Sequence, residues 1–128
     1  MLLVDSSIWI AVFRGELELQ DLGDEPLATC PPVVQEILQG AADQERYAYF
    51  RAALLSVVLL DAPMPLQRYE EAARIFLSCR RGKSPIRARS SYDCLIAACA
   101  MSHGATLLHK DRDFESMRGV IPLKTRAL

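Results

Sequence analysis

Residues 2–13 read "LLVDSSIWIAVF", and this stretch indicates how the fold begins. Residues 2–4 form a short apolar run typical of a buried strand, and the residues after Asp5 are typical of a helix. We expect Ser6 or Ser7 to cap this helix at its N-terminus. A carboxylate directly after a buried strand costs free energy unless a partner compensates its charge. The partner that compensates the charge of Asp5 is therefore expected to indicate the function of the chain.

The rest of the chain alternates strand-like and helix-like segments, which predicts an α/β fold with a mainly parallel central sheet flanked by helices. No repeat or interdomain linker interrupts the sequence, so we interpret residues 1–128 as a single domain. The helices are expected within residues 6–14, 31–41, 44–54, 65–81 and 90–104, and the strands within residues 2–4, 26–30, 56–61, 105–111 and 119–123.

Two of these segments carry a more specific expectation about burial. The β-branched run in 56–61 is typical of a buried strand. In 65–81, apolar residues recur at steps of three and four, which predicts one apolar helix face formed by Leu66, Tyr69, Ala73, Phe76 and Leu77.

Composition excludes several classes of protein. Of the 128 residues, 51% are hydrophobic, which is enough for a genuine core, and no apolar stretch is long enough to cross a bilayer. The N-terminus lacks the pattern of a secretory signal, so we expect a soluble, cytoplasmic protein with no membrane partner. The four cysteines show no CxxC pairing, and we interpret them as reduced packing thiols rather than as disulfides or a zinc site.

The net charge of −1 conceals an uneven distribution of charge. Residues 1–64 contain three basic and ten acidic side chains, whereas residues 65–128 contain twelve basic and six acidic ones. The densest basic run lies in "RRGKSPIRARSS" and is able to follow a phosphate backbone, although a solvated loop explains it as well. Its candidate nucleic-acid contacts are Arg80, Arg81, Lys83, Arg87 and Arg89.

Several carboxylates fall at equivalent places in the predicted sheet. Asp5 follows the first strand, and Asp93 lies in the first turn of a helix. Asp111 follows the run "TLL" of the strand-like segment 105–111, and Asp113 comes two residues later. Residues just past the carboxyl ends of parallel strands converge on one edge of the sheet. Glu36 is mid-helix among apolar neighbours, so it is expected to face the same crevice.

Carboxylates gathered in one crevice repel one another, and a divalent cation relieves the repulsion. Oxygen ligands suit Mg²⁺ or Mn²⁺, which activate water and stabilise charge on a phosphoryl group. Taken one at a time, the acids also have ordinary explanations as helix-terminal or turn residues. The sequence contains no GxGxxG, Walker or HExxH motif.

Four segments together resemble the PIN-domain family, and more narrowly the VapC-type toxins of bacterial toxin–antitoxin pairs. They are "LLVDSSIWI", "VVQEILQGA", "SSYDCLIAACA" and "LLHKDRDFESM", in the order that the family shows and over nearly the whole chain. The resemblance implies a PIN-like three-layer sandwich and a Mg²⁺- or Mn²⁺-dependent endoribonuclease. It also implies an RNA substrate, inhibition by a cognate VapB-type antitoxin, and a homodimer.

By motif match, the resemblance makes Asp5 and Asp93 the principal metal ligands and catalytic acids, with Glu36 completing the pocket and Asp111 as the fourth acid. The chain departs from the family at one position, where His109 stands in place of a Thr or Ser. Because of this departure, Asp113 is a candidate to replace or assist Asp111.

Two other functions remain open from the sequence. The first is an idle PIN scaffold that binds RNA or protein without turnover. The second is a receiver-like phosphoacceptor domain with Asp61 as acceptor and Lys110 as its partner, although such a domain needs a second acid beside Asp5, where this chain has serines.

Overall fold

A computed structural model of the chain describes residues 1–80 and 91–128. Its centre is a five-stranded sheet in the order β3-β2-β1-β4-β5. Every neighbouring pair of strands is parallel, and β1 lies between its partners with Leu3 opposite both Ala28 and Leu107. The strands are β1 (Leu2–Val4), β2 (Leu27–Thr29), β3 (Val58–Leu59), β4 (Thr106–His109) and β5 (Thr125–Ala127).

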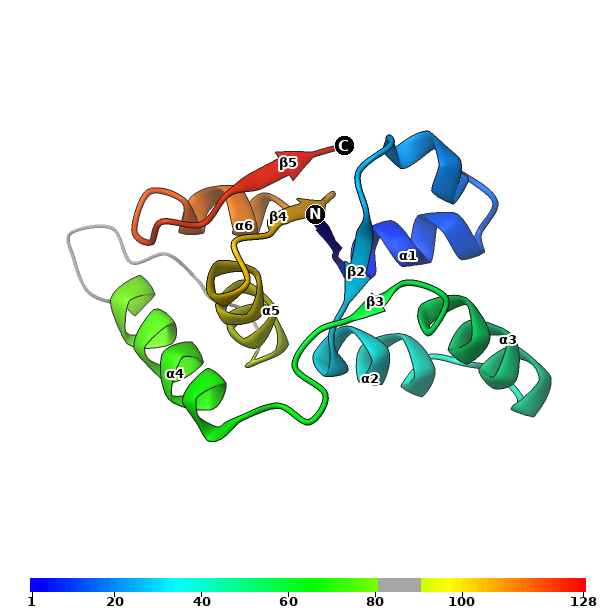
Figure 1. Cartoon of the computed structure of the whole chain (residues 1–128), viewed down its shortest axis with the longest axis horizontal. Coiled ribbons are helices and arrows are strands. Elements are labelled where there is room, and N and C mark those ends of the chain that lie inside the picture. The colour runs from blue at the N-terminus through cyan, green and yellow to red at the C-terminus, as the bar shows by residue number, and fades with distance from the viewer. Residues whose placement is uncertain (81–90) are drawn as a thin grey trace.

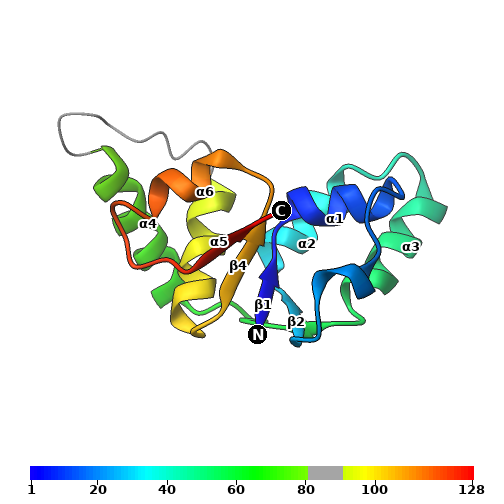
Figure 2. The same ribbon diagram turned by 90° about the horizontal axis from the view of Figure 1, so that it is seen from above.

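Helices cover both faces of this sheet. The helices are α1 (Ser6–Phe13), α2 (Pro31–Gln39), α3 (Gln44–Leu54), α4 (Leu66–Arg80), α5 (Ser91–Ser102) and α6 (Arg112–Met117), with a 3-10 turn η1 (Leu19–Leu22). Figure 2 shows α1, α2 and α3 on one side of the sheet and α4, α5 and α6 on the other. The prediction of a three-layer α/β sandwich with a parallel sheet is confirmed.

The core lies between these layers. All three residues of β1 are fully buried, as are Leu107 and Leu108 of β4, because both strands are covered on both faces. Trp9 of α1 and Phe114 of α6 are the largest side chains buried completely. Figure 1 shows β1 and β4 at the middle of the molecule, so the residues that follow them emerge from the centre of the sheet.

Two strand expectations were wrong in detail. The strand expected to be buried in 56–61 is the two-residue edge strand β3, in which Val58 is 48% and Leu59 40% exposed. An edge strand pairs on one side only, so a β-branched run there remains partly in solvent. The last strand is not in 119–123 but at Thr125–Ala127; Pro122 has no N–H to donate to a ladder.

The predicted apolar face of α4 is present, but it faces solvent and not the core. The helix buries Ala72, Ile75 and Cys79, while Leu66, Tyr69, Ala73, Phe76 and Leu77 are exposed. The buried face of α4 packs against α5, whose own buried residues are mostly alanine and cysteine. Small side chains on both helices permit close packing, which leaves the large side chains of α4 on the outside.

Within residues 1–80 and 91–128, no helix combines the length and hydropathy that crossing a bilayer requires. All four cysteines are free and buried, in agreement with the expectation of reduced packing thiols.

Candidate active site

The acidic residues singled out in the sequence meet at the carboxyl edge of the sheet. Asp5 follows β1, Asp111 follows β4, and Asp93 lies in the first turn of α5. Carboxylate oxygens of Asp93, Asp111 and Asp113 lie within 4.8 Å of one another. The parallel topology therefore gathers residues that are more than a hundred positions apart in the chain.

Asp5 is buried, with 5% of its surface exposed, and it caps α1. Its Oδ2 accepts hydrogen bonds from the backbone N–H of Ser7 at 3.0 Å and from the Ser7 hydroxyl at 2.6 Å. The expectation that Ser6 or Ser7 caps this helix was wrong, because the extended backbone at Asp5 directs its carboxylate onto the first turn. Burial raises the pKa of Asp5, against the lowering effect of Ser7 and with a further rise from Asp111.

The two serines have other roles in the site. The Ser7 hydroxyl accepts a hydrogen bond from the backbone N–H of Lys110 at 3.0 Å, so it joins the residues that follow β1 to those that follow β4. The Ser6 hydroxyl donates to Oε1 of Glu36 at 2.8 Å and thereby fixes that carboxylate against α1.

Glu36 reaches the same edge from the middle of α2. It is half-buried, as its apolar helix neighbours suggested. Its pKa is raised first by burial and then by the charges of Asp5 and Asp111, while the hydrogen bond from Ser6 lowers it. Repulsion by Asp5 and Asp111 shows that Glu36 belongs to the acidic group.

The pKa of Asp93 is affected by the charges of the other four acids of the group. Burial, followed by repulsion from Asp5, Asp111, Glu36 and Asp113, raises the pKa of Asp93 to about 7. A carboxyl group that is held half-protonated near neutral pH is a strong sign of unrelieved negative charge.

Between the two candidates for the fourth acid, Asp111 is the more central. Its charge raises the pKa of Asp5, Glu36 and Asp93, whereas the charge of Asp113 is a cause only for Asp93. Asp111 also caps α6, where its Oδ1 accepts the backbone N–H of Asp113 at 2.9 Å.

His109 positions Asp111, a role that the sequence did not reveal. This residue is buried at the end of β4, and its Nδ1 accepts the backbone N–H of Asp111 at 3.0 Å. Its Nε2–H therefore donates to Oε1 of Glu115 at 2.9 Å, which fixes the tautomer of the ring. The turn that carries Asp111 is thus supported by an imidazole instead of a hydroxyl.

The structure gives a mixed result for the candidate nucleic-acid contacts. Arg80 ends α4, and its guanidinium lies 5.4 Å from the centre of the Phe76 ring. The other candidates, Arg81, Lys83, Arg87 and Arg89, lie outside the described residues. The sequence interpretation overlooked Lys110 and Arg112 as such contacts, although both are exposed and flank Asp111.

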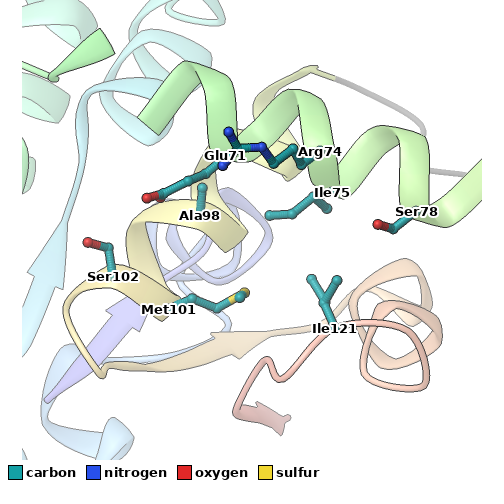
Figure 3. A pocket seen from close by; sticks show the side chains of 8 residues that line it. All are labelled: Glu71, Arg74, Ile75, Ser78, Ala98, Met101, Ser102 and Ile121. Atoms are coloured by element: carbon teal, nitrogen blue, oxygen red, sulfur yellow. The ribbon is translucent and has the colours of Figure 1, made fainter. Parts of the chain in front are cut away.

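Two of the hollows on the described part of the chain differ in whether they reach the acidic group. A cleft of about 350 Å³ at the junction of α4 and α5, with Ile75, Met101 and Ile121 among its lining residues, does not reach it (Figure 3). An apolar groove of about 320 Å³ between α1, α2 and α3 is lined in part by Ile10 and Phe50, and it also touches Glu36. The second groove is therefore the one that adjoins the candidate site.

Comparison with known proteins identifies the family. The profile of the PIN domain matches residues 2–120. The chain belongs to the PIN-domain family. Within that family it is similar to the VapC ribonuclease Mb1587 of Mycobacterium bovis and to ribonuclease VapC11 of Mycobacterium tuberculosis. Each is 32% identical over 132 residues, and each alignment covers 97% of this chain and 96% of the relative. This PIN domain is thus a VapC-type toxin ribonuclease by family.

Solved structures agree on the fold of this PIN domain. VapBC2 from Rickettsia felis, bound to a DNA fragment from its promoter, matches with a TM-score of 0.75 at 14% identity, over 99% of this chain and 98% of the other. VapC20 of Mycobacterium tuberculosis, a toxin that cleaves the sarcin–ricin loop, matches with a TM-score of 0.69 at 17% identity. The match covers 97% of this chain and 99% of VapC20. The receiver-like alternative has no support, because Asp61 is ion-paired with Arg68 and His103.

The donor set of this PIN domain fits a hard divalent cation. Asp93, Asp111 and Asp113 offer oxygen atoms only, and Asp5 and Glu36 add charge around them. Oxygen donors suit Mg²⁺ or Mn²⁺ rather than a softer ion.

Metal-free protein should lose stability as the pH rises from 5 to 8. Because the folded-state pKa of Asp93 is about 7, the folded chain binds this proton more tightly than the unfolded chain between about pH 4 and pH 7. Asp93 keeps some contact with solvent, which screens its charge. We therefore expect the fall in the free energy of unfolding between pH 5 and pH 8 to be about 1–2 kcal/mol smaller in Asp93→Asn than in the wild type. Urea unfolding in EDTA at pH 5 and pH 8 measures this free energy.

Glu45→Gln, which removes an exposed carboxylate of α3, is the matched control and should follow the wild type. Added Mg²⁺ should restore stability to the wild type at pH 8. A wild-type stability that is unchanged or rises over this pH range would contradict the assignment of repelling acids.

Proposed function

We propose that this chain is a Mg²⁺- or Mn²⁺-dependent endoribonuclease that hydrolyses RNA phosphodiester bonds in the cytoplasm, as the toxin of a toxin–antitoxin pair. The observation that carries the proposal is the gathering of carboxylates at one sheet edge, where oxygens of Asp93, Asp111 and Asp113 lie within 4.8 Å of one another and the charges of Asp5 and Glu36 also act on Asp93. A divalent cation relieves the repulsion within such a group. The names of the VapC relatives support the activity.

Each acid has a role that follows from its position. Asp5 and Asp93 would hold the ion, and the hydrogen bonds from Ser7 keep the Asp5 carboxylate in one orientation. Glu36 and Asp111 would orient the attacking water by accepting its hydrogen bonds, and Asp113 lies beside Asp111. When bound, the ion would lower the pKa of that water and stabilise negative charge on the scissile phosphate.

Basic residues beside the acids bind the flanking phosphates. Lys110 and Arg112 are exposed on either side of Asp111, so their side chains are available to an RNA strand whose scissile bond lies at the acids. Arg80, Arg81, Lys83, Arg87 and Arg89 precede Asp93 in the chain, and we propose that they extend this contact.

Removal of a single acid charge should abolish RNA cleavage. Asp5→Asn and Asp93→Asn should each lower the rate by at least about 10³-fold, since metal charge stabilisation contributes several kcal/mol to such reactions. Asn retains the ability to cap α1, so the fold should persist in Asp5→Asn. Asp111→Asn should lower the rate more than Asp113→Asn. Cleavage of a labelled RNA in Mg²⁺ measures the rate of each variant, and circular dichroism checks that each variant is folded.

Glu45→Gln should cleave at the wild-type rate. Full activity of folded Asp93→Asn would contradict the mechanism. RNA binding by the wild type without any cleavage in Mg²⁺ or Mn²⁺ would instead indicate a binding module.

A VapB-type antitoxin is the proposed protein partner, and the groove between α1, α2 and α3 is its proposed binding site. Ile10, Phe13 and Phe50 give the groove an apolar lining suited to an amphipathic segment, and Glu36 lies at its side. A segment in this groove is positioned to insert a basic side chain among the acids and so replace the metal. Solved relatives of this fold include VapBC complexes from Rickettsia felis and Salmonella typhimurium.

Ile10→Arg should weaken the complex with the antitoxin encoded beside this gene at least tenfold, because the charge enters an apolar groove. Ile10 is 41% exposed, so the free protein should fold and cleave RNA normally. Val120→Arg, at a residue 40% exposed and outside the groove, is the control. Equal affinity of both variants, measured by calorimetry, would contradict this site.

We also propose that a second copy of the chain covers the exposed face of α4. Leu66, Tyr69, Phe76 and Leu77 form this face. The last three of these residues, together with Leu95 of α5, border a groove of about 440 Å³. Patches of this kind mark association surfaces, and one helix face suits a two-fold symmetric contact.

Leu77→Glu should convert the dimer to a monomer in sedimentation, because it introduces like charges across a symmetric contact. Val120→Glu should leave the dimer intact. A wild-type protein that sediments as a monomer at high concentration would contradict the homodimer.

A further inference from the structure

A second cluster of ligand-type side chains lies on the part of α5 that is remote from Asp93. It consists of Asp61, Cys99 and His103, whose Oδ, Sγ and imidazole nitrogen atoms lie within 4.8 Å of one another. Cys99 lies near the end of α5, and His103 is the first residue after the helix, where its backbone N–H still donates to the carbonyl of Cys99 at 3.2 Å. Asp61 comes from the segment between β3 and α4, which passes below α5 in Figure 1.

The Asp61 side chain is only 7% exposed and is ionised within this cluster. Burial raises the pKa of Asp61, but hydrogen bonds from His103, Cys99 and Arg68 outweigh this effect and hold the pKa below its usual value. Nε2 of His103 donates to Oδ1 at 2.9 Å, and Nε of Arg68 donates to Oδ2 at 2.9 Å. Three donors thus converge on one carboxylate.

Arg68 acts as an outer support for this carboxylate. Its NH1 also donates to Glu71 at 3.1 Å, so the guanidinium is fixed from two sides and holds Asp61 in one orientation. Oδ1 of Asp61 accepts the hydrogen bond from His103, so an ion bound here would take the place of that proton between the imidazole and the carboxylate. A carboxylate oriented by an outer hydrogen-bond partner is a common arrangement around protein-bound metals.

The donor set differs from that of the acidic site. One sulfur, one nitrogen and one oxygen form a set suited to a borderline-soft ion, whereas three carboxylates suit Mg²⁺. Cysteine and histidine ligands a few residues apart in the chain, completed by a ligand from another segment, are common in zinc sites.

We propose that Asp61, Cys99 and His103 form a second metal site that binds Zn²⁺, with water in the fourth position. On binding, the Cys99 thiol would release its proton to solvent. The neutral imidazole of His103 would give up its Nε2 proton to solvent and take one from solvent on Nδ1, so that Nε2 replaces its hydrogen bond to Asp61 with a bond to the ion. The His103 side chain is 31% exposed, so the cluster meets solvent at this residue.

The consequence is a metal link between two parts of the fold. The ion joins the segment after β3 to the helix that carries Asp93, six residues before Cys99. This site is independent of the proposed ribonuclease activity, because none of its three residues belongs to the acidic group.

Co²⁺ binding tests the site, with the protein reduced and freed of metal beforehand. The wild type should bind one equivalent with the intense visible absorption of a tetrahedral ion and a thiolate-to-cobalt charge-transfer band, and Zn²⁺ should displace it. The double variant Asp93→Asn, Asp111→Asn should give the same bands, since it removes only the oxygen site. Cys79→Ala, a buried cysteine outside the cluster, is the matched control.

Cys99→Ala should abolish the charge-transfer band and weaken Zn²⁺ binding more than about 100-fold, since even an outer-shell partner is worth 10–100-fold. His103→Asn lies nearer the surface and provides a variant whose folding is secure; it should lose the tetrahedral bands and the rise in melting temperature that Zn²⁺ gives the wild type. The absence of a charge-transfer band in the wild type would overturn the proposal. So would a loss of this band in Cys79→Ala as large as the loss in Cys99→Ala.

Discussion

Mutual repulsion among the carboxylates at the sheet edge is the constraint on which this PIN domain depends. Parallel strands bring Asp5 and Asp111 to one edge, and α5 and α2 add Asp93 and Glu36. Burial intensifies the repulsion, since charges taken out of water interact more strongly. The apolar core, with β1 and β4 fully enclosed, supplies the stability that holds these acids together.

Short hydrogen bonds organise this edge without neutralising it. Ser7 joins Asp5 to the backbone after β4, Ser6 ties Glu36 to α1, and His109 supports the turn of Asp111. The serine hydroxyls orient carboxylates by donating to them, and His109 orients Asp111 by accepting its backbone N–H, but none of these contacts brings a positive charge. The remaining negative charge is what makes the edge a binding site for a cation and, through it, for a phosphate.

The sequence predicted the layers of the fold and the membership of the acidic group, because both follow from local patterns. Apolar runs indicate buried strands, and acids after them must share an edge once the sheet is parallel. The face that α4 buries was not predictable, since the helix carries apolar residues on two sides and its contact with small residues of α5 decides between them. The exposure of β3 depends on its place at the sheet edge, which no local pattern records.

The finer features of the site depend on contacts between distant residues. Ser6 interacts with Glu36, 30 positions away, and Ser7 interacts with Lys110, more than a hundred positions away. The cluster of Asp61, Cys99 and His103 has no recognisable spacing, because Asp61 is 38 positions before Cys99 in the chain. Motif spacing reveals ligand sets on one helix, whereas tertiary packing assembles this one.

Titration of the Asp93 carboxyl carbon by NMR tests the central claim most directly. With metal removed, the apparent pKa should be about 7, and saturating Mg²⁺ should lower it by several units. A pKa near the ordinary value of about 4 without metal, or one that Mg²⁺ leaves unchanged, would contradict the account of acids gathered around a shared ion.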